Sequence, residues 1–207
     1  MKNKIKHVTI CLLIMMLLLL TSCSPNSGAK ITYDEITGYN FVELLNQEKD
    51  SVLKMLKKSQ IEIDKERDIE NAAVYTIPGR LFGNASQKST LMFSAYGDSR
   101  EMKLYRYYEI AEIAWWPSES DEMGEKVIRL YEKLKDTYGE PGHCSPQIGE
   151  SGIIGKPVNR QIEWNLPEDD LNISIQISGD KDSFHFMITY SSIEGEKAQR
   201  ERLNTAL

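Results

Sequence analysis

Residues 162–190, IEWNLPEDDLNISIQISGDKDSFHFMITY, decide the fold of this chain. Apolar and polar side chains alternate in three runs, which is the pattern of strands that bury one face and expose the other. Two polar turns, at 167–170 and 179–182, separate the runs. The stretch therefore predicts a three-stranded antiparallel meander. Its inward-facing side chains are expected to be Ile162, Trp164, Leu166, Leu171, Ile173, Ile175, Ile177, Phe184, Phe186, Ile188 and Tyr190.

A helix is expected directly before this meander. Apolar residues recur at helical spacing from Met123 to Tyr138. Ser118 and Ser120 offer N-caps, and Gly139 supplies the stop. The helix would cover the apolar face of the three strands.

The preceding part of the chain follows the same order more loosely. A helix is expected over 41–56, interrupted near 46–50, and strands are expected at 73–77, 89–96 and 102–113. The sequence thus predicts an α+β fold with two tandem units of one helix and three antiparallel strands (αβββαβββ). A weak internal duplication is a hypothesis that this order raises.

The N-terminus has the pattern of a secretory signal. Three lysines precede an apolar run at 8–20, which is shorter than the roughly 20 residues that a membrane-spanning helix needs. The run ends in Leu20-Thr21-Ser22-Cys23, which resembles the lipobox of bacterial lipoprotein precursors. This resemblance implies that residues 1–22 are removed and that Cys23 carries a diacylglycerol anchor on the extracytoplasmic side of the membrane. Residues 23–33 are then the lipidated cysteine and a flexible tether.

Loss of the signal makes the chain strongly acidic. The full chain has 25 basic and 31 acidic residues, and removal of three lysines takes its formal charge from −6 to −9. Such a chain gains nothing from phosphate neutralisation, which argues against nucleic acid and anionic headgroups as partners. The expected partners are the membrane, through the lipid on Cys23, and an envelope protein or wall component. The sequence sets neither the oligomeric state nor the number of membranes in the envelope.

No motif in the sequence specifies a reaction. Cys11 leaves with the signal and Cys23 is lipidated, so Cys144 is the only free thiol of the mature chain and no disulfide is expected. His143 is its neighbour, but the pair lies in a Gly- and Pro-rich segment without an orienting third group. No His or Cys pair has the spacing of metal ligands, and nucleophile elbows, phosphate loops and dinucleotide fingerprints are missing. We therefore expect no catalytic residue, cofactor or metal site.

An aromatic cluster supplies the candidate partner surface. In the strand expected at 102–113, Tyr105 and Tyr107 alternate out of phase with the apolar residues, so both are expected on the opposite face. Either this face packs against the second unit, or it is left open for a partner. Arg106 falls on the apolar phase and indicates a bulge. The candidate surface comprises Tyr75, Met92, Tyr105, Tyr107, Trp115 and Trp116.

Two α-β meander units in tandem resemble, in element order, the β-lactamase-inhibitor-protein-like fold and the small lipoproteins of outer-membrane assembly. That resemblance implies a binding module and assigns no role to any residue. The expected boundaries are 34–117 for the first unit, 118–192 for the second and 193–207 for a charged surface helix or tail. The sequence thus predicts a lipid-anchored envelope protein that acts as a non-catalytic binding module. A small envelope hydrolase or wall-modifying enzyme and a structural lipoprotein without a specific ligand are the alternatives.

Overall fold

The structure is a computed structural model that describes residues 31–205 except 70, 84–85, 98–99, 149–151 and 156–158. The predicted signal, the lipidated Cys23 and most of the predicted tether lie outside the described residues. Residues 31–33, which the sequence assigned to the tether, belong to the folded unit: the backbone N–H of Ile31 donates to Ser59 Oγ at 2.9 Å. Among the described residues, no helix is both long enough and apolar enough to cross a bilayer.

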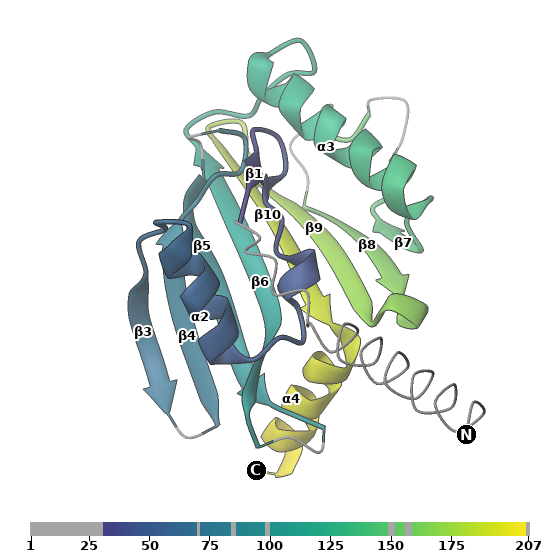
Figure 1. Cartoon of the computed structure of the whole chain (residues 1–207). Coiled ribbons are helices and arrows are strands. Elements are labelled where there is room, and N and C mark those ends of the chain that lie inside the picture. The colour runs from purple at the N-terminus through teal and green to yellow at the C-terminus, as the bar shows by residue number, and fades with distance from the viewer. Residues whose placement is uncertain are drawn as a thin grey trace, which may run out of the picture. The chain divides into compact units, whose positions relative to one another are not determined.

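One antiparallel sheet organises the described part of the chain, and its strands follow the order β3-β4-β5-β6-β10-β9-β8-β7 (Figure 1). The α+β class is therefore confirmed. The strands span β3 (Asp64–Ile69), β4 (Ala72–Pro78), β5 (Ser86–Ala95), β6 (Met102–Ile113), β7 (His143–Ser145), β8 (Arg160–Leu166), β9 (Leu171–Asp180) and β10 (Ser183–Ser192). The remaining elements are β1 (Tyr33–Asp34), β2 (Gly38–Tyr39), η1 (Val42–Leu44), α2 (Lys49–Lys58), α3 (Glu122–Tyr138), η2 (Pro167–Asp169) and α4 (Ile193–Thr205).

The prediction of three strands after each helix was wrong, because four strands follow α2 and four follow α3. The sequence missed the two edge strands. β3 reads DKERDI and exposes all of its residues, so it shows no alternation between buried and exposed positions. Charges of this kind protect a sheet edge from pairing with another chain. β7 is three residues long, pairs with β8 alone among the described strands, and lies in the Gly- and Pro-rich segment around His143.

Two helices cover the same face of the sheet, α2 on the side of β4 and β5 and α3 on the side of β8 and β9 (Figure 1). The break expected near 46–50 is present, since η1 ends before Asn46, which has a φ of 67°, and α2 begins after it. The helix predicted up to Tyr138 is α3, and Gly139 ends it at a φ of 82°. Its N-cap is Asp121 instead of Ser118 or Ser120.

A bulge in β6 decides which way its aromatic residues point. Met92 opposes Arg106 whereas Phe93 opposes Leu104, so Tyr105 is an extra residue in the pairing. A bulge moves the residues after it to the other face of the sheet. Tyr107 therefore faces the helix-covered core, whereas Tyr105 packs under α4 on the other side. The expectation that Tyr105 and Tyr107 share a face was wrong for this reason, and the bulge lies where Arg106 indicated it.

The charged C-terminal segment forms α4, which is held by polar contacts. At its N-terminus, Ser192 Oγ accepts the N–H of Gly195 at 3.0 Å, and the Asp170 carboxylate accepts the N–H of Glu194 at 2.8 Å and the hydroxyl of Ser192 at 2.6 Å. Near its C-terminus, Arg202 donates to Ser94 Oγ at 2.8 Å. These contacts fasten a helix that buries little apolar surface.

Candidate functional site

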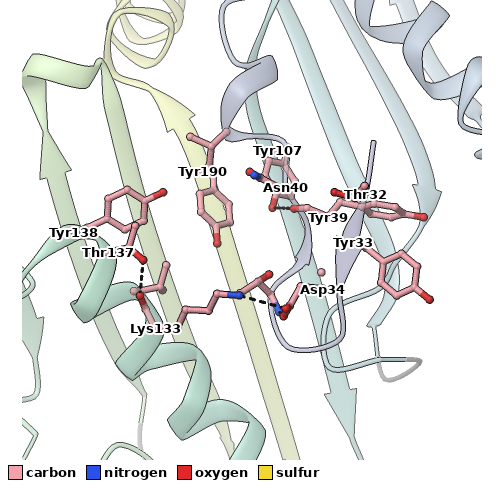
Figure 2. Close-up of a pocket in the computed structure, with 14 residues that line it drawn as sticks. Thr32, Tyr33, Asp34, Tyr39, Asn40, Tyr107, Lys133, Thr137, Tyr138 and Tyr190 are labelled. Atoms are coloured by element: carbon pink, nitrogen blue, oxygen red, sulfur yellow. Dashed lines mark hydrogen bonds and ion pairs between the residues drawn. The ribbon is translucent and has the colours of Figure 1, made fainter. Parts of the chain in front are cut away.

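A pocket of about 330 Å³ lies between the β1–β2 hairpin, α3 and the central strands β6 and β10 (Figure 2). Five tyrosines contribute to its lining, together with one lysine and one aspartate that face each other across the rim. We call this cavity the tyrosine pocket. Its lining residues are Thr32, Tyr33, Asp34, Thr37, Gly38, Tyr39, Asn40, Val42, Tyr107, Lys133, Leu134, Thr137, Tyr138 and Tyr190.

The hairpin that forms one wall of the pocket is shaped by its own side chains. Asp34 Oδ1 accepts the backbone N–H of Ile36 at 2.9 Å and of Thr37 at 3.0 Å, which closes the turn. Gly38 follows at a φ of +69°, and a Cβ there would lie 2.4 Å from Glu109 Oε1. Only glycine fits this position, because both the backbone conformation and the space exclude a side chain.

Glu109 fastens the hairpin to the sheet. This side chain is fully buried, and its two carboxylate oxygens accept three backbone N–H groups. Oε1 accepts that of Tyr39 at 3.0 Å, and Oε2 accepts those of Arg80 and Leu81 at 2.9 and 2.8 Å. A buried acidic group in a core strand is tolerated when its oxygens are satisfied in this way. The Glu109 clamp thus fixes the wall of the pocket.

Two stacked tyrosines form the floor of the pocket. Tyr107 and Tyr190 oppose each other on β6 and β10, and their rings are 4.9 Å apart and nearly parallel. The Tyr107 hydroxyl donates to the carbonyl oxygen of Tyr39 at 2.6 Å. Burial raises the pKa of Tyr107 and of Tyr190 well above the usual tyrosine value. Both hydroxyl groups are therefore protonated, and able to donate, at neutral pH.

No hydrogen bond to the Tyr190 hydroxyl is found among the described residues, and Tyr190, which is 5% exposed as a whole residue, lines the pocket. Figure 2 shows this hydroxyl pointing into the space between α3 and the hairpin. A hydroxyl that opens into a pocket can donate to water or to a ligand there. Tyr190 can therefore donate a hydrogen bond to a molecule in the pocket.

The rim of the pocket is closed by a weak contact. Lys133 Nζ on α3 lies 3.3 Å from Asp34 Oδ2 on the hairpin, and both side chains are about half exposed. Burial raises the pKa of Asp34, but the hydrogen bonds from Thr37 and Ile36 outweigh that effect and hold the pKa below its usual value. Exposed ion pairs of this kind contribute at most about 1 kcal/mol. The two side chains can therefore separate at little cost.

The arrangement is suited to binding. Aromatic walls, a hydroxyl donor and a pair of opposite charges at the mouth are the composition of a small ligand site. A nucleophile with an adjacent base is not found among the described lining residues. Within the described ranges, no group of three or more His, Cys, Asp or Glu side chains is placed to hold a metal ion.

The six residues of the predicted partner surface do not form one surface. Tyr75 is buried against the ring of Phe93, and Tyr107 is the only one of the six that lines the pocket. Tyr105 lies under α4 with its hydroxyl 3.9 Å from the sulfur of Met92. Trp115 is 53% exposed, whereas Trp116 donates through Nε1 to the carbonyl oxygen of Ile154 at 2.7 Å. The predicted lipidation site, Cys23, lies outside the described residues.

The sequence did not single out most of the pocket. Tyr190 and Tyr138 were read as core positions because they fall on the apolar phase of a strand and a helix. Tyr33 and Asp34 lie where a tether was expected to end, so no pattern pointed to them. His143 and Cys144 lie on the edge strand β7, where the Cys144 thiol donates to the carbonyl oxygen of Pro146 at 3.4 Å. The positions of these two residues on β7 give no support for Cys144 as a nucleophile activated by His143.

Comparisons of this chain with models of protein families, with curated proteins and with solved structures found no match. A function for the pocket therefore has to follow from the residues that build it.

Proposed function

We propose that the protein is a lipid-anchored component of a bacterial envelope that binds another envelope component in the tyrosine pocket, without catalysis. The observation that carries this proposal is the Tyr190 hydroxyl, which points into the pocket and has no hydrogen bond to a described residue. A ligand oxygen would complete the hydrogen bonding of this group. The stacked rings of Tyr107 and Tyr190 would support the ligand from below.

The position of the pocket in the chain agrees with a role near a membrane. Thr32 lines the pocket and follows the proposed lipid-bearing Cys23 by nine residues. An extended chain spans at most about 3.5 Å per residue, so the pocket would stay within about 30 Å of the lipid. Two acyl chains suffice for stable anchoring. The proposed ligand is therefore a molecule or protein segment that is accessible close to the membrane surface.

We also propose that the two halves of the sheet arose by duplication. Each half contains one helix followed by four antiparallel strands, and the last strands of the two halves, β6 and β10, pair at the centre of the sheet. The pocket floor combines one tyrosine from each of these strands. Joining two copies would thus have created the site at their junction.

Chemical crosslinking in intact envelopes, followed by purification of the protein, tests the binding function. Thr137 is exposed on α3 and lines the pocket, so Thr137→Trp would fill the mouth without entering the core. Asp136→Trp is the matched control, because Asp136 is an exposed neighbour on the same helix that does not line the pocket. Both variants are first shown to unfold at the same temperature as the native protein.

The proposal predicts a stoichiometric partner that the native protein and Asp136→Trp both recover and Thr137→Trp does not. Equal recovery by all three proteins would place the partner elsewhere. Recovery of background material alone by all three would refute the binding function and favour a structural lipoprotein. Turnover of an envelope polymer by the purified protein would favour the hydrolase instead.

A further inference from the structure

We propose that the open face of β8, β9 and β10 is a second binding site and that its ligand is a neutral, hydroxyl-rich glycan chain. This face is turned away from α2 and α3. Side chains that alternate with it, such as Ile162, Trp164 and Ile173, are buried on the helix-covered side. We call it the amide face, and its strand residues are Gln161, Glu163, Asn165, Asn172, Ser174, Gln176, Met187, Thr189 and Ser191.

The side chains of the amide face are arranged in rows across the strands. Gln161 opposes Gln176, Glu163 opposes Ser174, and Asn165 opposes Asn172. Each row continues on β10, with Met187, Thr189 and Ser191 in turn. Side chains opposed in this way lie about 5 Å apart, so one extended ligand could contact several of them.

α4 borders the amide face and makes it one side of a groove. Ile193, Glu196 and Arg200 of α4 line the same cavity as the strand residues, and its volume is about 340 Å³. Of the described helices, only α4 contributes to this lining. The sheet thus forms a floor and α4 forms one wall of a groove.

The charges of the groove cancel. Arg106 donates through Nε and Nη2 to the two carboxylate oxygens of Glu196 at 2.5 Å, and Gln161 donates to Glu163 at 2.6 Å. The other two charged residues of the lining, Arg200 and Glu163, have opposite charges, so the lining has no net formal charge. The exposed edge strand β3, by contrast, is charged, with the sequence DKERDI. The amide face presents mainly carboxamides in place of such charges, and its hydroxyls on Ser174 and Ser191 are buried at the base of the groove.

This chemistry selects one class of ligand. Carboxamides and hydroxyls both donate and accept, and the hydroxyls of a sugar do the same. A nucleic acid or another polyanion would need a positive groove, and an amphipathic helix would need an apolar one. A peptide that adds a strand would bind at a sheet edge. A neutral glycan is the ligand whose hydrogen-bonding groups the face can satisfy.

Binding of defined oligosaccharides to the full-length lipidated protein in detergent micelles tests the inference. The probes are a β-1,4-linked N-acetylglucosamine tetramer and a linear glucose tetramer, and the readouts are calorimetric affinity and backbone amide shifts by NMR. Each hydrogen bond contributes roughly tenfold or less in affinity, so we expect Asn165→Ala combined with Asn172→Ala to weaken binding by about tenfold or more. Gln147→Ala combined with Asn71→Ala removes two exposed amides outside the groove and should leave the affinity unchanged.

Saturable binding of at least one probe, with shifted amides confined to β8, β9, β10 and α4 and an affinity independent of salt, is the expected result. The inference is overturned if neither probe binds at millimolar concentration, if the control variant loses as much affinity as the groove variant, or if the shifted amides lie around the tyrosine pocket. The NMR shifts of the native protein decide the question even if the groove variant does not fold. Since the two sites lie on opposite faces of the sheet, Thr137→Trp should not change this affinity.

Discussion

Replacement of Glu109 by glutamine tests the clamp that fixes the pocket wall. The carboxylate accepts three backbone N–H groups, at 3.0 Å from Tyr39 and at 2.9 and 2.8 Å from Arg80 and Leu81. Glutamine has one oxygen, so its best orientation keeps the bonds from Arg80 and Leu81 and turns an NH₂ group toward the N–H of Tyr39. One buried donor is then left unsatisfied and faces another donor.

The size of the effect follows from these contacts. A hydrogen bond to a charged group contributes about 1.5–3 kcal/mol, and an unsatisfied buried donor costs about 1–3 kcal/mol. We expect Glu109→Gln to lower the free energy of unfolding by about 2–3 kcal/mol, and for a chain of this size that lowers Tm by about 5–10 °C. Glu109→Ala leaves all three donors unsatisfied and should cost about 4–6 kcal/mol, which approaches the whole stability of a typical domain.

Urea unfolding followed by circular dichroism measures this change, and amide hydrogen exchange locates it. Exchange should accelerate first at Tyr39 and in the β1–β2 hairpin. Glu112→Gln is the matched control on the same strand, because the Glu112 side chain is 47% exposed and its loss should change stability by less than about 0.5 kcal/mol. If Glu109→Gln is as stable as Glu112→Gln, the clamp does not hold the hairpin.

Three further predictions concern the backbone, the tyrosines and α4. Gly38→Ala should lower the free energy of unfolding by more than about 2 kcal/mol, because its Cβ would lie 2.4 Å from a carboxylate oxygen of Glu109. Gly97→Ala, also at positive φ but with no atom within 4 Å of the added Cβ, should lower it by about 1 kcal/mol, and thermal unfolding measures both changes. Burial raises the pKa of Tyr75 and of Tyr96 to about 12. The stability that these two groups contribute is therefore complete below about pH 10 and is lost as the pH rises through 12. A titration that follows tyrosinate absorbance should show their ionisation coupled to unfolding. Asp170→Ala should lower the free energy of unfolding by about 1–2 kcal/mol and speed exchange within α4, and unchanged exchange there would contradict its role in holding the N-terminus of the helix.

Strands that bury one face were predictable from the sequence, and the edges of the sheet were not. The meander at 162–190 alternates strictly, so β8, β9 and β10 follow from period two alone. β3 is solvated on both faces and β7 is only three residues long, so neither has an apolar phase to detect. Charged side chains and short length protect an edge strand from pairing with another chain. The same two features remove the alternation by which a strand is predicted from the sequence.

The pocket could not be predicted because its parts come from distant segments. Tyr107 and Tyr190 meet through the pairing of β6 with β10, which is a tertiary contact that no local pattern encodes. The bulge at Tyr105 then reversed the expected direction of Tyr107. Arg106 on the apolar phase indicated a bulge, but the sequence did not show which residue is the extra one. The pairing of β5 with β6 shows that it is Tyr105.

Occupancy of the tyrosine pocket in the native envelope tests the central claim most directly. Hydrogen exchange with mass spectrometry would be compared between the protein in intact envelopes and the purified lipidated protein. Our account predicts slower exchange in envelopes for peptides covering 31–42 and 131–140, unchanged exchange in β3, and loss of the difference in Thr137→Trp but not in Asp136→Trp. Identical exchange in the two preparations, or slowing that avoids the hairpin and α3, would contradict it.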